Sequence, residues 1–275
     1  MKDHLISIED IKKLHPLLNR DGLARFVMKL GGLNNVNRVY DSGKYASGPA
    51  IEDLMLDDVG VIRKVHHIEV LNQFEGQPFI TVSNHPYGHI DGIMLVGEVT
   101  KVRPDFKVMV NWMLGMIDTM QDHFIGVNPF GSGSLANRSS LGGIKECIRH
   151  VKDGHPLGFF PAGAISKTKI NRIEDRDWQP NVLRLIKKAN VPVVPVFISG
   201  NNSVFFNFLD WIDWRLRTVR LCHELNNKQG KTMQMIFGDP VSVEEQQQYS
   251  DIPAFGKFLK SKTYDLREVA ECRLT

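Results

Sequence analysis

The sequence predicts an α/β fold in which helices flank a mixed sheet. Strand-like apolar runs alternate with amphipathic helical segments from Val65 to Ile198, a pattern typical of a sheet with helices on its faces. The run from Val191 to Ile198 is apolar throughout, which predicts a strand buried on both faces. With 275 residues, of which 42% are hydrophobic, the chain is long enough to bury one large core.

The same pattern divides the chain into three parts. Residues 1–50 are predicted to be an N-terminal helical lead-in that becomes irregular toward a loop at 41–49, residues 51–243 the central domain, and residues 244–275 a helical C-terminal tail. Within the first two parts we expect helices at 8–18, 23–30, 51–59, 93–99, 135–152 and 182–189, and strands at 65–71, 78–82, 107–110, 125–127, 157–160, 191–198 and 234–241.

The composition argues against several classes of protein. A net charge of +3 is too small to indicate a nucleic-acid partner. The three cysteines, Cys147, Cys222 and Cys272, are far apart and lack metal-ligand spacing, so we expect reduced thiols and neither a disulfide framework nor a metal site. The N-terminus lacks the apolar core of a signal peptide, and no segment has the apolar length of a membrane span. We therefore expect a cytoplasmic protein that meets lipid only at a membrane surface.

A histidine and a carboxylate stand at one predicted strand-to-helix junction. The segment 83–92 contains His85 and Asp91, and a proline and a glycine between them favour a sharp turn that exposes His85. A histidine can take a proton near neutral pH, and a carboxylate can fix its tautomer and stabilise its charged form. His89 lies closer to Asp91 and is a rival base. A purely structural turn, in which His85 and Asp91 only cap their elements, is the alternative.

A second junction follows the strand at 157–160. Pro161, Ala162 and Gly163 form a loop there, and three cations follow closely. The cations are Lys167, Lys169 and Arg172. In the simplest interpretation they are solvated surface charges.

Two further segments suit contact with lipid. Residues 203–222 interleave aromatic side chains with arginines, a composition that fits a lipid–water boundary and equally fits a packed helix with a basic edge. Residues 111–117 are apolar and rich in methionine, as expected for core or, alternatively, for the wall of an acyl-chain groove.

Three blocks, in their order along the chain, resemble the glycerolipid acyltransferase family, the PlsC-type lysophospholipid acyltransferases. The blocks are Asn84-His85 with Asp91, then Phe160-Pro161-Ala162-Gly163, then Val191-Pro192-Val193-Val194-Pro195-Val196. The resemblance covers roughly residues 65–241. The segments around Asn202 and Arg217 resemble the hemolysin-type branch, which includes acyltransferases of ornithine and glycine lipids.

The resemblance implies O-acyl transfer without a metal or a cofactor. His85 would deprotonate an acceptor hydroxyl, Asp91 would orient His85, and the hydroxyl oxygen would attack the thioester of an acyl carrier protein or coenzyme A. Backbone amides near Gly163 would stabilise the oxyanion. The substrate-binding residues that match the family blocks are Asn84, Pro161, Ala162 and Gly163.

The sequence departs from the family pattern at three places. Five residues separate His85 from Asp91 where four are usual, a longer form that the hemolysin-type branch shares. Asn128 replaces the phosphate-binding arginine of the family, with Arg138 nearby but displaced. Ala162 replaces the glutamate of the Phe-Pro-Glu-Gly block. These last two changes remove most of a phosphate clamp, since an arginine can hold a phosphate through two hydrogen bonds.

We therefore expect a different acceptor, a monoacylated amino-acid lipid with a free hydroxyl. Its headgroup carboxylate would meet Lys167, Lys169 or Arg172. The predicted enzyme is a peripheral O-acyltransferase on the inner face of the cell membrane, with an acyl carrier protein or coenzyme A thioester as its partner. The alternatives are a 1-acyl-glycerol-3-phosphate acyltransferase, a thioesterase in which His85 activates water, and a non-catalytic lipid-surface binding module.

Overall fold

The strands form one large sheet and one small hairpin. The computed structural model describes residues 3–46, 48–111, 117–127, 134–169, 172–213, 216–217 and 220–272. The strands of the sheet are β1 (Ile62–His66), β2 (Ile80–Ser83), β3 (Lys107–Asn111), β4 (Phe124–Val127), β5 (Leu157–Phe159), β8 (Val193–Ile198) and β9 (Thr232–Phe237). The hairpin pairs β6 (Lys167–Lys169) with β7 (Arg172–Glu174).

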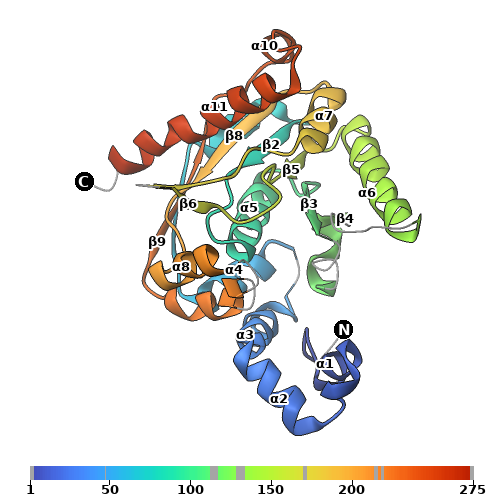
Figure 1. Ribbon diagram of the computed structural model, residues 1–275. Helices are drawn as coiled ribbons and strands as arrows, with labels where there is room; N and C mark the ends of the chain where they lie inside the picture. The colour runs from blue at the N-terminus through green and yellow to red at the C-terminus, as the bar shows by residue number, and fades with distance from the viewer. Residues whose placement is uncertain are drawn as a thin grey trace.

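The seven-stranded sheet is mixed, with the order β1-β9-β8-β2-β5-β3-β4 (Figure 1). Neighbouring strands from β8 to β4 run parallel. Strand β9 is antiparallel to β8, and β1 is parallel to β9. The carboxyl ends of β8, β2 and β5 therefore lie together at one edge of the sheet.

Helices cover both faces of the sheet. Their bounds are α1 (Ile8–Leu14), α2 (Asp21–Leu30), α3 (Leu33–Gly43), α4 (Ala50–Val59), α5 (His89–Val102), α6 (Ser134–Lys152), α7 (Pro180–Ala189), α8 (Val204–Ile212), α10 (Val243–Gln247) and α11 (Ile252–Cys272), with the 3-10 helices η1 (Pro16–Leu18), η2 (Ile68–Phe74), η4 (Asp118–His123) and η5 (Leu221–Asn227). Helices α6, α7 and α11 pack on one face, and α5, backed by α4, packs on the other (Figure 1). Helices α1 and α2 lie apart from the sheet at one end of the molecule (Figure 1). Within the described residues, no helix combines the length and the apolar character needed to cross a membrane.

Strand β8 shows why the sequence needs an uninterrupted apolar run. Val193 packs in the core beneath α6, α7 and α11, whereas Val194 and Val196 pack in the core on the α5 side. All residues of β8 are buried. Because helices cover both faces, neither side of this strand tolerates a polar residue without a partner.

The predicted fold class is confirmed, but two elements differ from the sequence-based expectation. Residues 33–43, expected to be irregular, form α3. The sequence of this helix is rich in asparagine and has a low helix propensity, but Val39 and Tyr40 are buried against α4, and this packing stabilises the helix. The strand expected at 65–71 ends at His66, because His67 adopts a positive φ of 62° and the chain continues as η2.

The C-terminal tail is helical as predicted, whereas the cationic loop contains strands that the sequence did not indicate. Helix α11 packs across β8 and β9 and buries Phe255 and Leu259. The loop that carries Lys167, Lys169 and Arg172 contains the hairpin β6–β7, whose strands are too short and polar to show a strand pattern.

Helix α6 packs so closely on β4 that one glycine is required at the contact. A Cβ at Gly143 would collide with the carbonyl oxygen of Gly126, whereas Gly142 faces open space. We predict that Gly143→Ala lowers the free energy of unfolding by about 1–3 kcal/mol through overpacking. We predict that the matched control Gly142→Ala raises it by about 0.5–1 kcal/mol through helix propensity. Urea unfolding followed by circular dichroism measures both, and equal effects of the two substitutions would contradict this packing.

Candidate active site

The candidate site lies where β2 and β5 end. These parallel neighbours pair Val82 with Phe159, so the loops that follow them leave the same edge of the sheet. His85 follows β2 and Phe160 follows β5, and their ring centroids are 4.3 Å apart. The carboxyl edge of parallel strands commonly collects functional groups from separate loops. The first two blocks predicted from the sequence thus come together here.

One carboxylate oxygen organises the turn between β2 and α5. Oδ2 of the fully buried Asp91 accepts the backbone N–H groups of Tyr87 at 2.8 Å and Gly88 at 2.9 Å. The Gly88 N–H is one of the donors that the start of a helix leaves without an intrahelical partner, and the positive end of the helix dipole favours an anion at this position. The same oxygen lies 3.0 Å from Nδ1 of His85.

The contact with Asp91 determines which ring nitrogen of His85 can exchange a proton with a substrate. Nδ1 is buried and lies 3.0 Å from Asp91 Oδ2 without the alignment of a hydrogen bond. The His85 side chain as a whole is still 19% exposed. Since Nδ1 faces the carboxylate, Nε2 is the nitrogen left to exchange a proton with a substrate.

A turn at Gly88 accommodates the additional residue between His85 and Asp91. Gly88 precedes α5 with a φ of +92°, a conformation that strongly favours glycine. A Cβ at this position would lie 2.9 Å from Cδ1 of Ile165, which belongs to the loop after β5. The additional residue therefore leaves the histidine–carboxylate contact intact.

His89 does not fit the role of rival base. Its Nε2 lies 3.3 Å from the carbonyl oxygen of Leu221, and its Nδ1 accepts the backbone N–H of Ile90 at 3.0 Å. Burial lowers the pKa of His89 to about 4, although the contact with Leu221 opposes this shift, so the ring is neutral at pH 7. With both ring nitrogens engaged, His89 has no free acceptor for a substrate proton.

Two asparagine side chains hold this turn from the β8 side. Asn84 Nδ2 donates to the Ile198 carbonyl at 2.8 Å, and its Oδ1 accepts the Ile198 N–H at 2.7 Å. Asn202 Nδ2 lies 3.2 Å from the Tyr87 carbonyl and 3.3 Å from the Pro86 carbonyl. Because both polar groups of the Asn84 amide are engaged, this residue has a structural role beside His85, and its contact with substrate stays a prediction.

The loop after β5 is a tight turn with a buried centre. Ala162 is fully buried, and the Gly163 N–H donates to the Phe160 carbonyl at 3.0 Å. The amide of Gly163 itself is therefore already engaged and does not match the oxyanion donor that we expected near this residue. Contacts of Pro161, Ala162 and Gly163 with substrate stay predictions.

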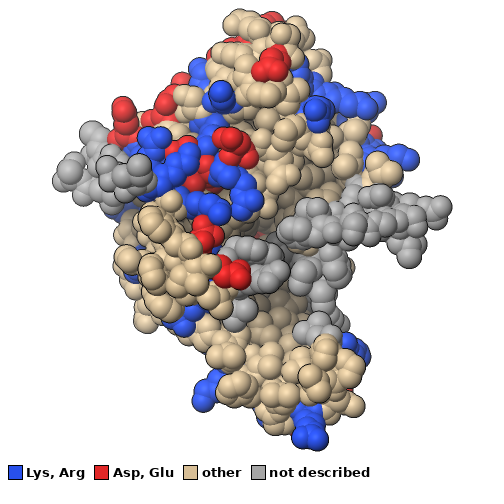
Figure 2. All heavy atoms as spheres, in the orientation of Figure 1, with Lys and Arg blue, Asp and Glu red and all other residues tan. Residues whose placement is uncertain are grey.

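The three cations predicted to meet a headgroup carboxylate are paired with acidic side chains. Lys167 Nζ lies 3.2 Å from Asp210 Oδ2. Lys169 Nζ and Arg172 Nε lie 3.2 Å and 2.8 Å from the carboxylate of Glu174. Figure 2 shows a mixed cluster of cationic and anionic side chains over β6. An incoming carboxylate would have to compete with these pairs, and the role of the three cations in binding stays a prediction.

Arg217 is a buried cation next to the site that the sequence did not single out for binding. It is 6% exposed, and its Nη2 donates to the Ser166 carbonyl at 2.5 Å. Its Nη1 lies 3.2 Å from Asp210, and its guanidinium stacks over the ring of Phe206 at 4.8 Å. Arg217 thus ties α8 to the loop that follows β5.

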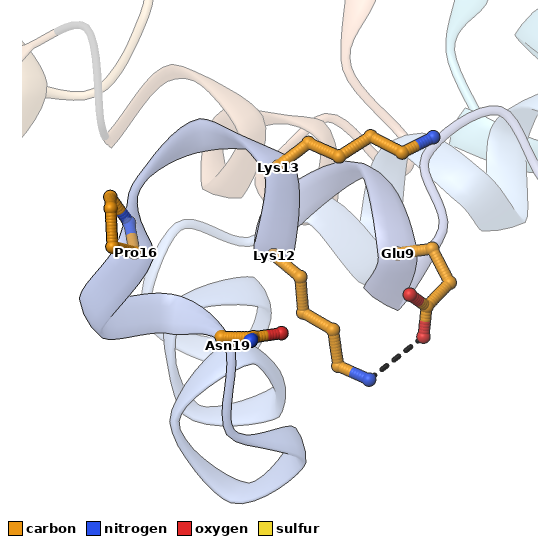
Figure 3. Close-up of a pocket in the computed structure, with 5 residues that line it drawn as sticks. All are labelled: Glu9, Lys12, Lys13, Pro16 and Asn19. Carbon is orange, nitrogen blue, oxygen red and sulfur yellow. Dashed lines mark hydrogen bonds and ion pairs between the residues drawn. The ribbon is translucent and has the colours of Figure 1, made fainter.

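The hollow drawn in Figure 3 lies elsewhere, on α1 and η1. It is lined by Glu9, Lys12, Lys13, Pro16 and Asn19. Lys12 donates to Glu9 at 2.8 Å and also pairs with Asp21. The lining contains neither His85 nor any other residue of the β2–β5 edge, so we assign no part of the reaction to this hollow.

Several residues used in the sequence analysis are not covered by the structural description. Asn128 and the methionine-rich segment 112–116 lie outside the described residues, and Arg138 lies on α6 with its side chain outside the description. Among the described residues, no three His, Cys, Asp or Glu side chains gather as metal ligands. Cys147 and Cys222 are free thiols.

Comparison with known proteins identifies the class of enzyme to which this chain belongs. The chain belongs to the acyltransferase family, whose sequence model matches residues 55–272. It is therefore an acyltransferase, and the resemblance noted in its sequence is confirmed.

Two curated relatives and one solved structure are similar to this chain. Over 192 residues the chain is 25% identical to a lyso-glycine lipid O-acyltransferase of Phocaeicola vulgatus, an alignment that covers 67% of each protein. Over 197 residues it is 26% identical to a lyso-glycine lipid O-acyltransferase of Bacteroides thetaiotaomicron, covering 67% of this chain and 68% of that protein. The crystal structure of the 1-acyl-sn-glycerophosphate acyltransferase PlsC from Thermotoga maritima matches with a TM-score of 0.51 and 16% identity, covering 89% and 87% of the two chains. This last similarity shows a shared fold.

Proposed function

We propose that this enzyme transfers a fatty acyl group from a carrier thioester to the hydroxyl of a lyso-glycine lipid or a similar monoacylated amino-acid lipid. The observation that carries the proposal is the 3.0 Å contact between His85 Nδ1 and Asp91 Oδ2, placed where β2 and β5 end. The donor is the thioester of an acyl carrier protein or of coenzyme A. In this proposal the pair is a general base with its supporting carboxylate.

The reaction then needs only proton transfer and one nucleophilic attack. His85 Nε2 takes the proton of the acceptor hydroxyl while the hydroxyl oxygen attacks the thioester carbonyl carbon. Asp91 stabilises the resulting imidazolium at 3.0 Å. The tetrahedral intermediate collapses, the C–S bond breaks, and the imidazolium returns its proton to the departing thiolate. The products are an ester and a free thiol, and no acyl-enzyme forms.

Two observations support an amino-acid lipid as acceptor. Both curated relatives are named lyso-glycine lipid O-acyltransferases. The residue that stands in place of the glutamate of the family block is Ala162, whose methyl group is fully buried and offers no polar contact to a phosphoglycerol headgroup. Lys167 is the candidate partner for the carboxylate of a glycine headgroup, in exchange for its present pair with Asp210.

We further propose that the exposed face of α8 meets the membrane that supplies this acceptor. Phe208 and Trp211 are 56% and 75% exposed, and Arg220 stacks over the exposed ring of Phe205 at 5.5 Å. Figure 2 shows a mostly uncharged surface over α8. Aromatic and cationic side chains next to each other fit the boundary between headgroups and acyl chains. Trp214 and Arg215, in the same sequence segment, lie outside the described residues.

The choice of acceptor and base is tested by acyl transfer with purified protein. Acyl carrier thioester is supplied with lyso-glycine lipid or lysophosphatidate, and products are identified by mass spectrometry. We predict diacylated glycine lipid as the main product, and a fall in kcat of about 10²–10⁴-fold for His85→Ala at an unchanged melting temperature. His155→Ala is the matched control, because His155 also contacts an aspartate, Asp105 at 2.7 Å, but lies before β5 and outside the site.

The other outcomes separate the alternatives. Phosphatidate as main product would show that the acceptor is wrong, and free fatty acid in the presence of acceptor would indicate a thioesterase. Full activity of His85→Ala would show that the base is wrong.

The membrane contact is tested by sedimentation with vesicles of phosphatidylethanolamine and phosphatidylglycerol. We predict that Phe208→Ser with Trp211→Ser weakens binding by about tenfold or more, since two aromatic side chains lose their burial in the interface. Leu141→Ser on α6 removes a comparably exposed apolar side chain, at 56%, and should bind as the wild type does. Unchanged binding of the α8 variant would refute this contact.

A further inference from the structure

A second carboxylate, which the mechanism above does not use, lies buried behind His85. Asp175 follows β7 and is 0% exposed. Its Oδ1 accepts the backbone N–H of His85 at 3.2 Å and the hydroxyl of Ser166 at 2.6 Å, and its Oδ2 accepts the indole N–H of Trp178 at 3.1 Å. Burial raises the pKa of Asp175, and the hydrogen bonds from Ser166 and Trp178 oppose this shift. Three donors around one carboxylate suit its ionised form.

Ser166 binds the second polar backbone group of His85. Its own N–H donates to the His85 carbonyl at 2.8 Å. The chain that follows β5 therefore binds both polar backbone groups of His85. Ser166 binds the carbonyl oxygen, and the Asp175 side chain binds the N–H. Since Asp91 contacts the ring from the α5 side, the histidine is held from two directions.

Helix α11 supports Asp175 from the opposite side. The Asp175 N–H donates to the Tyr264 hydroxyl at 2.7 Å, and Lys260 Nζ donates to the Asp175 carbonyl at 2.7 Å. Tyr264 also packs edge-on against Phe197 of β8, at 5.8 Å between ring centroids. Contacts with α11, which itself packs on β8, therefore fix the position of Asp175 together with its own loop.

We propose that Asp175 is a positioning residue for acyl transfer, which acts by fixing the His85 backbone so that the ring meets the acceptor hydroxyl. The proposal rests on the proposed role of His85 as base. The hydrogen bond that Asp175 makes to His85 is to the main-chain N–H, so the effect that we propose is one of placement. A displacement of about 1 Å in a reacting group can cost about a hundredfold in rate.

Three variants test this proposal in the intact protein. Asp175→Ala removes the acceptor of the His85 N–H, Asp175→Asn keeps one acceptor oxygen at similar volume, and Asp177→Ala is the control, an exposed aspartate two positions further on. The readouts are kcat and KM for thiol release with a saturating acceptor, and hydrogen–deuterium exchange at the His85 amide.

We expect Asp175→Ala to lower kcat by about ten- to a hundredfold, with KM for the thioester within about twofold. The His85 amide should exchange about tenfold faster, while core amides of β8 keep their protection. Asp175→Asn should retain more activity than Asp175→Ala, and Asp177→Ala should match the wild type. If Asp175→Ala does not fold, Asp175→Asn is expected to show the same changes with smaller amplitude.

Parallel assay of His85→Ala separates this inference from the proposed function. If His85→Ala is inactive but both Asp175 variants keep wild-type kcat and His85 exchange, the positioning role is overturned while the base assignment stands. If His85→Ala is fully active, the base assignment fails and the positioning role fails with it. A loss of protection throughout the sheet in Asp175→Asn, at unchanged kcat, would show that Asp175 serves stability alone and would also overturn the proposal.

Discussion

The structure around the candidate site depends on a single oxygen, Oδ2 of Asp91. It terminates the N-terminal end of α5 by accepting the N–H groups of Tyr87 and Gly88, and it contacts the ring of His85 at 3.0 Å. The same atom therefore shapes the turn and pairs with the histidine. Because the carboxylate is fully buried, water cannot replace these contacts, and a loss of the turn would also move the carboxylate away from His85.

Buried polar groups from distant parts of the chain surround this turn. Lys228 and Glu224 form an ion pair at 3.2 Å with no exposed surface, and Lys228 lies over the ring of Tyr87 at 5.0 Å. Glu224 also accepts the N–H and the hydroxyl of Ser203, at the start of α8. The membrane-facing surface that we propose on α8 is thereby connected through Ser203, Glu224 and Lys228 to the turn that follows His85. Such a network favours one arrangement of the site, since any partial opening would leave buried charges without partners.

The sequence alone predicted those features whose residues are close together along the chain. His85 and Asp91 stand in one short segment, and the apolar run of β8 is unbroken, so local pattern indicated both. Asp175 was missed, and Arg217 was noted only for the family resemblance, because the burial of both depends on elements far away in the sequence. Asp175 sits in a polar stretch that looks like a surface loop, and its supporting groups Tyr264 and Lys260 belong to α11. A tryptophan three positions later, Trp178, was the only local sign that this stretch turns inward.

Tertiary contacts also account for the secondary structure that was not predicted from the sequence. Helix α3 is stabilised by Val39 and Tyr40 packing against α4 and not by helix propensity, so a single sequence gives little indication of it. Gly88 was expected to form a turn, but the close approach of Ile165 that makes a side chain costly there is a tertiary contact. The choice of acceptor depended partly on Asn128, which lies outside the described residues, and so it rests on Ala162 and on the curated relatives.

The activity of a folded Asp91→Asn variant tests whether the Asp91 carboxylate supports proton transfer by His85. The amide oxygen can still accept the Tyr87 and Gly88 N–H groups, so the turn should persist, but the negative charge next to His85 is lost. We predict that kcat/KM falls by about a hundredfold or more while the melting temperature changes by only a few degrees, as about 1 kcal/mol of lost stability would give. A folded Asp91→Asn variant with kcat/KM within about twofold of the wild type would contradict the claim that this carboxylate supports proton transfer by His85.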